Sequence, residues 1–240
     1  MIPKKYSKQS NLSYTLGATL TIELLENKPH VVKHVYVHSE TTRNDTFLLI
    51  ERLCAINHIS LSQNNKAFNI LSEKENVFYI GEFEKYQSPL KENTNHLVLV
   101  NPANMGNLGT IIRTMVGFNL NQLVIITPAV DLFDPKVIRA SMGSFFHLHF
   151  SLFPSFDDYQ KAYKNHPYCF MLNGKHHLGE ISFQSPYAMV FGNEATGLDA
   201  SFLATFDSVR INHSDTIDSL NLPMAVGIAL YEQTKSHFQK

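Results

Sequence analysis

The sequence predicts an α/β protein in two parts, with a mainly parallel sheet in the second part. This prediction rests on four short apolar runs, each with the length and composition of a buried parallel strand. The runs are residues 97–100, 123–126, 168–172 and 187–191. Helical patterns separate most of them, and such alternation is typical of an open sheet covered by helices. We therefore expect ligands at the carboxyl ends of these strands.

The first part shows a shorter alternation. Apolar spacing predicts helices over residues 16–25 and 47–56, and strands over residues 31–37 and 77–83. Residues 82–96 are polar and contain Pro89, which is typical of a domain boundary. We therefore expect an α/β domain over residues 1–88, a linker over 89–95 and a second domain over 96–240.

The composition is that of a globular protein with 44% hydrophobic residues and a net charge of −1. No apolar run approaches the ~18 residues of a membrane span, and we expect no secretion signal because no apolar segment follows the first lysines. Cys54 and Cys169 are the only cysteines, which indicates a reducing cytoplasm. His58 follows Cys54 by one helical turn, but no Cys-x-x-Cys pair completes a zinc site, so we expect no metal.

Lysines outnumber acids near the N-terminus. Residues 1–38 contain Lys4, Lys5, Lys8, Lys28 and Lys33 against two glutamates. A phosphate-contacting face fits this pattern, and so does a frayed, well-solvated terminus.

The first loop of interest, NPANMGN at residues 101–107, leads into an expected helix that carries Arg113. Two glycines precede Arg113, Gly106 by seven residues and Gly109 by four, and Gly117 follows it by four. Glycine weakens a helix by about 1 kcal/mol relative to alanine, so this side is expected to be kept clear for a close neighbour. The loop has neither the glycine fingerprint of a dinucleotide site nor the Gly-Lys-Ser/Thr of a phosphate loop.

Two further loops follow expected strands. GNEATG at residues 192–197 places Asn193 and Glu194 between glycines at the end of a strand. Residues 211–221 lead into an apolar helix over 222–235, where Ser219 and Asn221 could cap free N–H groups and Pro223 suits the first turn. This helix is apolar almost all round, which fits a core helix or a subunit interface.

Four stretches together resemble the SpoU (TrmH-like) family of RNA ribose methyltransferases in the SPOUT superfamily. They are NPANMGNLGTIIRT, VIRASMGSFFHLHF, MVFGNEATGLD and DSLNLPMAVGIALYE, in this order. The resemblance implies a deep trefoil knot in the second domain and a homodimer packed around the last helix. It also implies that the first domain is a small ribosomal-protein-like domain that binds substrate RNA. From the lysine cluster described above, we expect Lys4, Lys5, Lys8 and Lys33 to contact this RNA.

The resemblance further implies S-adenosylmethionine as methyl donor, with S-adenosylhomocysteine as product. By position in the motifs, the expected catalytic residues are Arg113, Asn104, Glu194, Ser219 and Asn221. The expected cofactor-binding residues are Gly192, Asn193, Ile211, His213, Leu220 and Asn221. Ribosomal RNA is favoured over transfer RNA as substrate; a base methyltransferase of the same superfamily and a non-catalytic RNA-binding relative are the alternatives.

Two departures from the family pattern affect the cofactor loops. Ala195 stands where the family usually has glycine, and Asn212 and His213 stand where it usually has proline and methionine. Arg113 could activate the ribose hydroxyl or hold a phosphate with two parallel hydrogen bonds; a guanidinium is a poor base. His147 and His149, expected on one face of a strand, and His176 and His177, expected in a turn, are interpreted as structural or surface residues.

Overall fold

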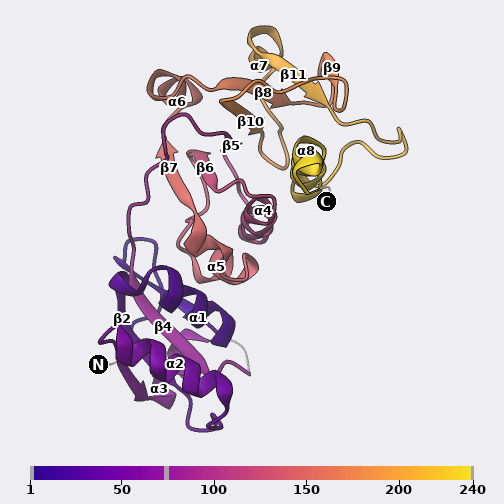
Figure 1. Ribbon diagram of the computed structural model, residues 1–240. Coiled ribbons are helices and arrows are strands. Elements are labelled where there is room, and N and C mark those ends of the chain that lie inside the picture. The colour runs from indigo at the N-terminus through magenta and orange to yellow at the C-terminus, as the bar shows by residue number, and fades with distance from the viewer. Residues whose placement is uncertain (1–2, 73–75, 239–240) are drawn as a thin grey trace. The chain divides into compact units, whose positions relative to one another are not determined.

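The computed structural model describes residues 3–72 and 76–238 (Figure 1). The chain separates into two compact units, one formed by Met1–Gln87 with Asp131–His147 and the other by Ser88–Val130 with Leu148–Lys240. The sequence prediction places residues 131–147 in the second domain, whereas in the structure they pack with the first unit. No described helix is long and apolar enough to cross a membrane.

The first unit is a four-stranded sheet with helices. Its sheet has the order β1-β4-β2-β3, with β4 antiparallel to both neighbours and β2 parallel to β3. Its elements in chain order are β1 (Leu12–Leu16), α1 (Ala18–Asn27), η1 (Pro29–Val31), β2 (Val32–Val37), α2 (Asp45–Ile56), β3 (Ser60–Gln63), α3 (Asn65–Leu71), β4 (Tyr79–Glu84), α5 (Pro135–Ala140) and η2 (Ser144–His147). The expected helix from residue 16 therefore starts two residues later, because Leu16 ends a strand.

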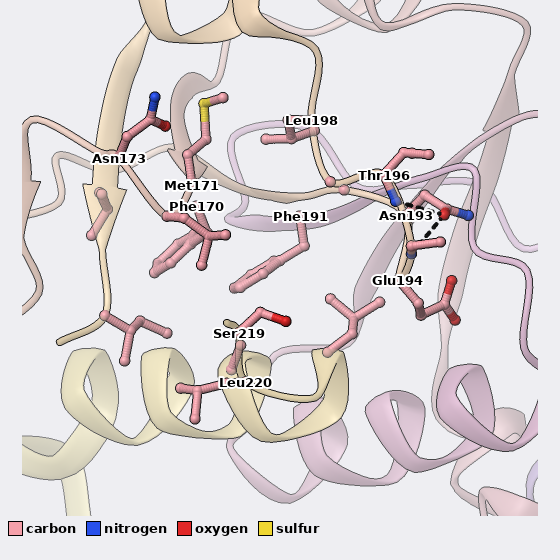
Figure 2. A pocket seen from close by; sticks show the side chains of 18 of the residues that line it. Phe170, Met171, Asn173, Phe191, Asn193, Glu194, Thr196, Leu198, Ser219 and Leu220 are labelled. Carbon is pink, nitrogen blue, oxygen red and sulfur yellow. Dashed lines mark hydrogen bonds between the residues drawn. The ribbon is translucent and has the colours of Figure 1, made fainter. Parts of the chain in front are cut away.

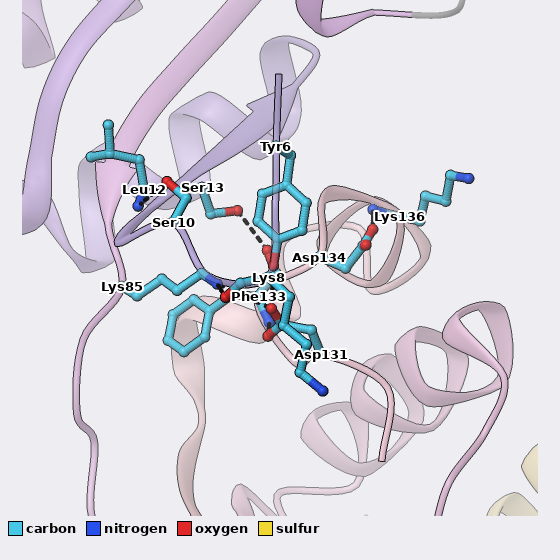
Figure 3. A network of polar contacts seen from close by, with 10 residues as sticks. All are labelled: Tyr6, Lys8, Ser10, Leu12, Ser13, Lys85, Asp131, Phe133, Asp134 and Lys136. Atoms are coloured by element: carbon cyan, nitrogen blue, oxygen red, sulfur yellow. Dashed lines mark hydrogen bonds and ion pairs between the residues drawn. The ribbon is translucent and has the colours of Figure 1, made fainter. Parts of the chain in front are cut away.

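Residues 131–147 join the first unit through a polar network and an aromatic cluster. The carboxylate of Asp131 accepts hydrogen bonds from the Tyr6 hydroxyl and from Lys85 Nζ, the latter at 3.0 Å (Figure 3). The Ser13 hydroxyl donates to the Phe133 carbonyl at 2.5 Å. Burial alone would raise the pKa of Asp131, but the hydrogen bonds from Tyr6, the Phe133 N–H group and Lys85 lower it below its ordinary value.

The aromatic part of this junction is buried. Phe133 lies 6.5 Å from Phe83 and 5.4 Å from Tyr86, measured between ring centroids, and Phe146 lies 5.5 Å from Phe83. Phe145, Phe146 and Phe133 are at most 9% exposed. Removing residues 1–87 would uncover these rings, so the first unit cannot be deleted without exposing apolar surface.

The second unit is a seven-stranded sheet in which every paired neighbour is parallel, with the order β7-β6-β5-β10-β8-β11-β9. This confirms the expected mainly parallel sheet. The elements are β5 (His96–Val100), α4 (Met105–Gly117), β6 (Gln122–Ile126), β7 (His149–Phe153), α6 (Phe156–Ala162), β8 (His166–Phe170), β9 (His176–His177), β10 (Tyr187–Phe191), α7 (Ala200–Thr205), β11 (Asp207–Arg210), α8 (Leu222–Thr234) and η3 (Lys235–Phe238). The expectation that His147 and His149 share a strand face was wrong, because His147 ends the η2 turn and only His149 lies in β7.

Alternating side chains divide the core of this unit between the two sheet faces. Val98, Val124 and Val190 pack on one face with Phe156 and Tyr159 of α6. The neighbouring leucines of β5, Leu97 and Leu99, are fully buried on the other face. Helices α4 and α8 lie against each other in this unit (Figure 1), and their amino-terminal ends carry two of the loops that define the site.

The second unit buries a histidine at the start of β5. His96 begins β5, is fully buried, and its Nδ1 lies 2.9 Å from the Tyr159 hydroxyl. Burial lowers the pKa of His96 from 6.5 to about 4.

We predict that part of the free energy of unfolding is lost between pH 6.5 and pH 4, because there the unfolded chain binds a proton at residue 96 that the folded chain excludes. The full loss is about 3 kcal/mol at 1.36 kcal/mol per pKa unit. Urea unfolding of His96→Gln over this range should show a shallower pH dependence than the wild type, whereas replacing the exposed His176 by glutamine should not. Equal slopes for wild type and His96→Gln would contradict the assignment.

Candidate functional site

The loops after β5 and β10 meet at one edge of the sheet because these strands are parallel neighbours. Asn193 ties them together, since its Nδ2 donates to the Asn101 carbonyl at 2.7 Å. Its Oδ1 accepts from the N–H groups of Ala195 at 2.9 Å and Thr196 at 3.3 Å, which folds the GNEATG loop back on itself. Asn193 therefore shapes its own loop and fixes it to the neighbouring one.

Glu194 makes a second link between the same loops. Its carboxylate accepts hydrogen bonds from the main-chain N–H groups of Ala103 at 3.1 Å and Asn104 at 3.2 Å, and from Asn107 Nδ2 at 3.2 Å. The carboxylate thus lies at the amino-terminal end of α4, where the helix dipole favours negative charge. Asn104 caps the helix, because its Oδ1 accepts from the Asn107 N–H at 3.0 Å.

Gly192 lets the chain turn sharply at the end of β10. A Cβ atom at this position would lie 2.1 Å from the carbonyl carbon of Gly197 and 2.4 Å from Leu198 N. Gly197 itself has a positive φ of 69°, a conformation that glycine adopts at little cost. Only glycine therefore fits at residue 192, and the main chain of this loop lies close to the site without a side chain between.

A cavity of about 300 Å³ opens beside these loops (Figure 2). One wall is aromatic: the rings of Phe170 and Phe191 stack at 4.3 Å with an interplanar angle of 10°. The lining residues come from four segments, namely residues 170–173, 191–198, 209–213 and 219–225. Glu194 and His213 are the lining residues with titratable side chains.

The cavity brings together most of the residues predicted from the sequence. Of the predicted cofactor-binding residues, Gly192, Asn193, Ile211, His213 and Leu220 line it and Asn221 does not. Of the predicted catalytic residues, Glu194 and Ser219 line it, and Asn104 is bonded to Glu194. In the described part of the chain, Arg113 and Asn221 lie outside the lining.

Arg113 and Asn221 nevertheless have free side chains. Arg113 is exposed on α4 and makes no hydrogen bond or ion pair with any described residue. Asn221 is the N-cap residue of α8 but makes no side-chain cap hydrogen bond, so the expected capping by its side chain was wrong. Pro223 lies in the first turn of α8, as predicted.

Sequence reasoning missed the segment after β8. Phe170, Met171, Leu172 and Asn173 line the cavity, although they carry no polar motif. The strand-end rule could have found them, because the chain leaves a parallel strand here as it does after β5 and β10. No group of three metal-binding side chains occurs among the described residues.

Comparison with known proteins identifies relatives of the second unit and of the whole chain. The model of the SpoU rRNA Methylase family matches residues 94–231. A Synechocystis protein named as an uncharacterized tRNA/rRNA methyltransferase is 31% identical over 157 residues, 64% of this chain and 57% of that protein. This chain therefore spans little more than half the length of that relative.

Two other matches extend over nearly the whole chain. The 23S rRNA (guanosine(2553)-2'-O)-methyltransferase of Bacillus subtilis is 28% identical over 232 residues, 95% of this chain and 90% of the relative. The AdoMet-bound rRNA methyltransferase structure from Sinorhizobium meliloti has a TM-score of 0.79 at 24% sequence identity. The superposition covers 96% of this chain and 89% of the Sinorhizobium chain. This structural likeness shows the same fold.

The hydrogen bonds of Glu194 predict a stability effect. Replacing Glu194 by alanine removes the hydrogen bonds to the N–H groups of Ala103 and Asn104, which are exposed and can bond to water instead, so the net cost is about 0.5–1.5 kcal/mol. Chemical unfolding should show a loss of this size for Glu194→Ala. Glu180→Ala is the matched control, because the Glu180 side chain is exposed and makes no hydrogen bond or ion pair with described residues. Equal stabilities of the two variants would show that Glu194 does not hold the loops together.

Proposed function

Because the chain belongs to the SpoU rRNA methylase family, we propose that it transfers a methyl group from S-adenosylmethionine to the 2′-hydroxyl of a ribose in RNA. The observation that carries this proposal is the cavity at the strand ends. Two of the three loops named from the sequence, at residues 192–197 and 211–221, contribute to its lining. The third, at residues 101–107, is hydrogen-bonded to Glu194 of the lining, and the family match covers all three loops.

The cavity has the chemistry that the methyl donor needs. The Gly192 turn and the loop at residues 211–213 present main-chain groups, and Phe191, Leu198 and Leu220 provide apolar surface. We assign cofactor binding to Gly192, Asn193, Ile211, His213 and Leu220. When bound, the sulfonium supplies an activated methyl group, and the protein must align it with the ribose oxygen.

Arg113 is the residue we propose to act on the RNA. A guanidinium stays protonated and makes a poor base, but its fork of donors can hold a phosphate and stabilise the alkoxide that develops on the ribose. Its exposed and unpaired guanidinium supports this role. We propose that Ser219 and Asn221 bind the reacting groups, and that Glu194 and Asn104 position the loops, because their side chains already bond within the protein.

We propose that the first unit binds substrate RNA, with ribosomal RNA favoured over transfer RNA. Support comes from the Bacillus relative, which matches both units. Lys4 lies on a segment anchored by the Tyr14 hydroxyl, which donates to the Lys4 carbonyl at 2.8 Å. Lys4, Lys5 and Lys8 are exposed, whereas Lys33 forms an ion pair with Glu84 at 2.8 Å and is the weaker candidate.

We also propose the trefoil knot implied by the family. Its support is the family match together with one close approach of backbone to backbone in the second unit. A Cβ on Gly174 would lie 2.5 Å from the Val209 carbonyl carbon, so this position requires glycine.

A homodimer is the assembly we propose, because α8 exposes an apolar stripe. Met224, Ile228 and Tyr231 are 60%, 38% and 58% exposed, and they follow the spacing of one helix face. Phe118 lies 6.4 Å from the Tyr231 ring and extends this surface. A second copy is the proposed cover, because one stripe on a twofold axis can pack against itself.

The activity and the role of Arg113 can be tested together. Incubation with radiolabelled S-adenosylmethionine and total RNA from cells lacking the gene should place the label in dinucleotides that resist alkali, because alkaline cleavage requires a free 2′-hydroxyl. Arg113→Ala should lower the rate about a hundredfold while S-adenosylhomocysteine still binds. Arg113→Lys should recover little, because lysine lacks the planar fork.

Lys161→Ala, which removes another exposed cation of the second unit, is the control and should methylate normally. If the label instead appears in mononucleotides released by alkaline cleavage, the methyl group is on a base and the protein is a base methyltransferase. Normal rates for Arg113→Ala would remove Arg113 from the mechanism.

The dimer predicts that Ile228→Glu gives a monomer in sedimentation velocity at micromolar concentration, where the wild type should be dimeric. A buried, unpaired carboxylate opposes association. Leu152→Glu is the control, because Leu152 is 52% exposed on β7 and lies outside the α8 stripe. A monomeric wild type, or equal dissociation by both variants, would contradict the proposal.

A further inference from the structure

The loop at residues 211–213 is held from outside the cavity by β9. Ile211 and His213 line the cavity, whereas the Asn212 side chain is exposed and its Oδ1 lies 2.7 Å from His177 Nδ1. His177 is a β9 residue that does not line the cavity. The hydrogen bond therefore connects a residue behind the site to the segment that forms its wall.

This bond continues a series of contacts along β11. The segment after β8 donates main-chain hydrogen bonds from Met171 N–H to the Val209 carbonyl at 3.0 Å and from Leu178 N–H to the Arg210 carbonyl at 2.9 Å. After Arg210 the main-chain contacts stop: within the described ranges, residues 211–213 make no main-chain to main-chain hydrogen bond. The His177–Asn212 bond extends the series two residues further, to the loop that forms the wall of the cavity.

A second side-chain hydrogen bond closes the loop from within. His213 Nδ1 lies 2.9 Å from the Ile211 carbonyl oxygen. A carbonyl oxygen only accepts, so Nδ1 carries the proton and donates it. The conformation of residues 211–213 thus depends on two side-chain bonds, one inside the loop and one to β9.

We propose that His177 is a positioning residue for the methyl-donor site, acting through Asn212 to hold residues 211–213 in the conformation that binds the ligand. The proposal rests on the function proposed above. It assigns to His177 no contact with cofactor or RNA. Losing one such hydrogen bond should weaken ligand binding by about 3- to 10-fold, the range expected for a net bond of 0.5–1.5 kcal/mol.

His176 provides a matched control in the same strand. Side chains alternate along a strand, so His176 and His177 face opposite sides of the sheet. His176 Nε2 lies 3.7 Å from an oxygen of Asp207, and His176 does not line the cavity. Its replacement removes an imidazole from β9 but leaves the link to Asn212 in place.

The test is a double-mutant cycle on the full chain, with calorimetric titration of S-adenosylhomocysteine. His177→Ala and Asn212→Ala should each raise Kd by about 3- to 10-fold, and the double variant should be no worse than the weaker-binding single variant. His176→Ala should bind like the wild type. The melting temperature of all ligand-free variants should be unchanged, and for His177→Ala the KM for S-adenosylmethionine should rise while kcat is kept.

Wild-type Kd values for His177→Ala and Asn212→Ala would overturn the proposal. So would a double variant whose loss is the product of the two single losses, because the two residues would then act independently. An equal loss for His176→Ala would show a general effect of β9. Failure of the wild type to bind S-adenosylhomocysteine would instead count against the proposed function.

Discussion

The site depends on one carboxylate more than on any other group. Glu194 accepts hydrogen bonds from the main chain of Ala103 and Asn104 and from the side chain of Asn107, and so joins the end of β10 to the start of α4. Among the described residues, Asn193 makes the other side-chain hydrogen bond between these two loops. The cavity lies against this junction, so its shape follows from how firmly the two strand ends are held together.

The same principle applies around the rest of the cavity, where the protein fixes main chain rather than presenting many polar side chains. Gly192 leaves no room for a Cβ, and the Gly174 backbone lies close to that of Val209. Asn193 bonds to its own loop, and His213 bonds to Ile211. Prearranged main-chain groups bind a ligand with little loss of conformational entropy.

The sequence predicted the parts of this structure that local patterns determine. Periodicity located β10 at its observed bounds and α8 to within one residue of its end. Strand-end reasoning selected two of the segments that contribute to the cavity lining, at residues 192–197 and 211–221. The sequence prediction missed β3, because Ser60–Gln63 is a short and mostly exposed strand without apolar alternation. It also assigned residues 131–147 to the second domain. No local pattern shows that Phe133 and Phe146 pack on Phe83, because Phe83 lies far from both of them in the sequence. The Asn212–His177 bond was beyond reach for the same reason.

The distribution of charged groups limits how the hydroxyl proton can be removed. Methyl transfer to a ribose requires that proton to leave, and the cavity lining has two titratable side chains, Glu194 and His213. The Glu194 oxygens already accept N–H groups of the α4 loop, and His213 Nδ1 donates to Ile211. Glu194 is therefore not arranged as a base, whereas an imidazole that donates through Nδ1 keeps the lone pair of its Nε2. Arg113 lies outside the lining with its donors free. In the proposed methyl transfer, alignment of donor and acceptor and stabilisation of the developing negative charge add to the rate. The hydrogen bonds of Glu194 hold the loops beside the cavity, and small displacements of these loops would reduce the alignment on which the proposed reaction depends.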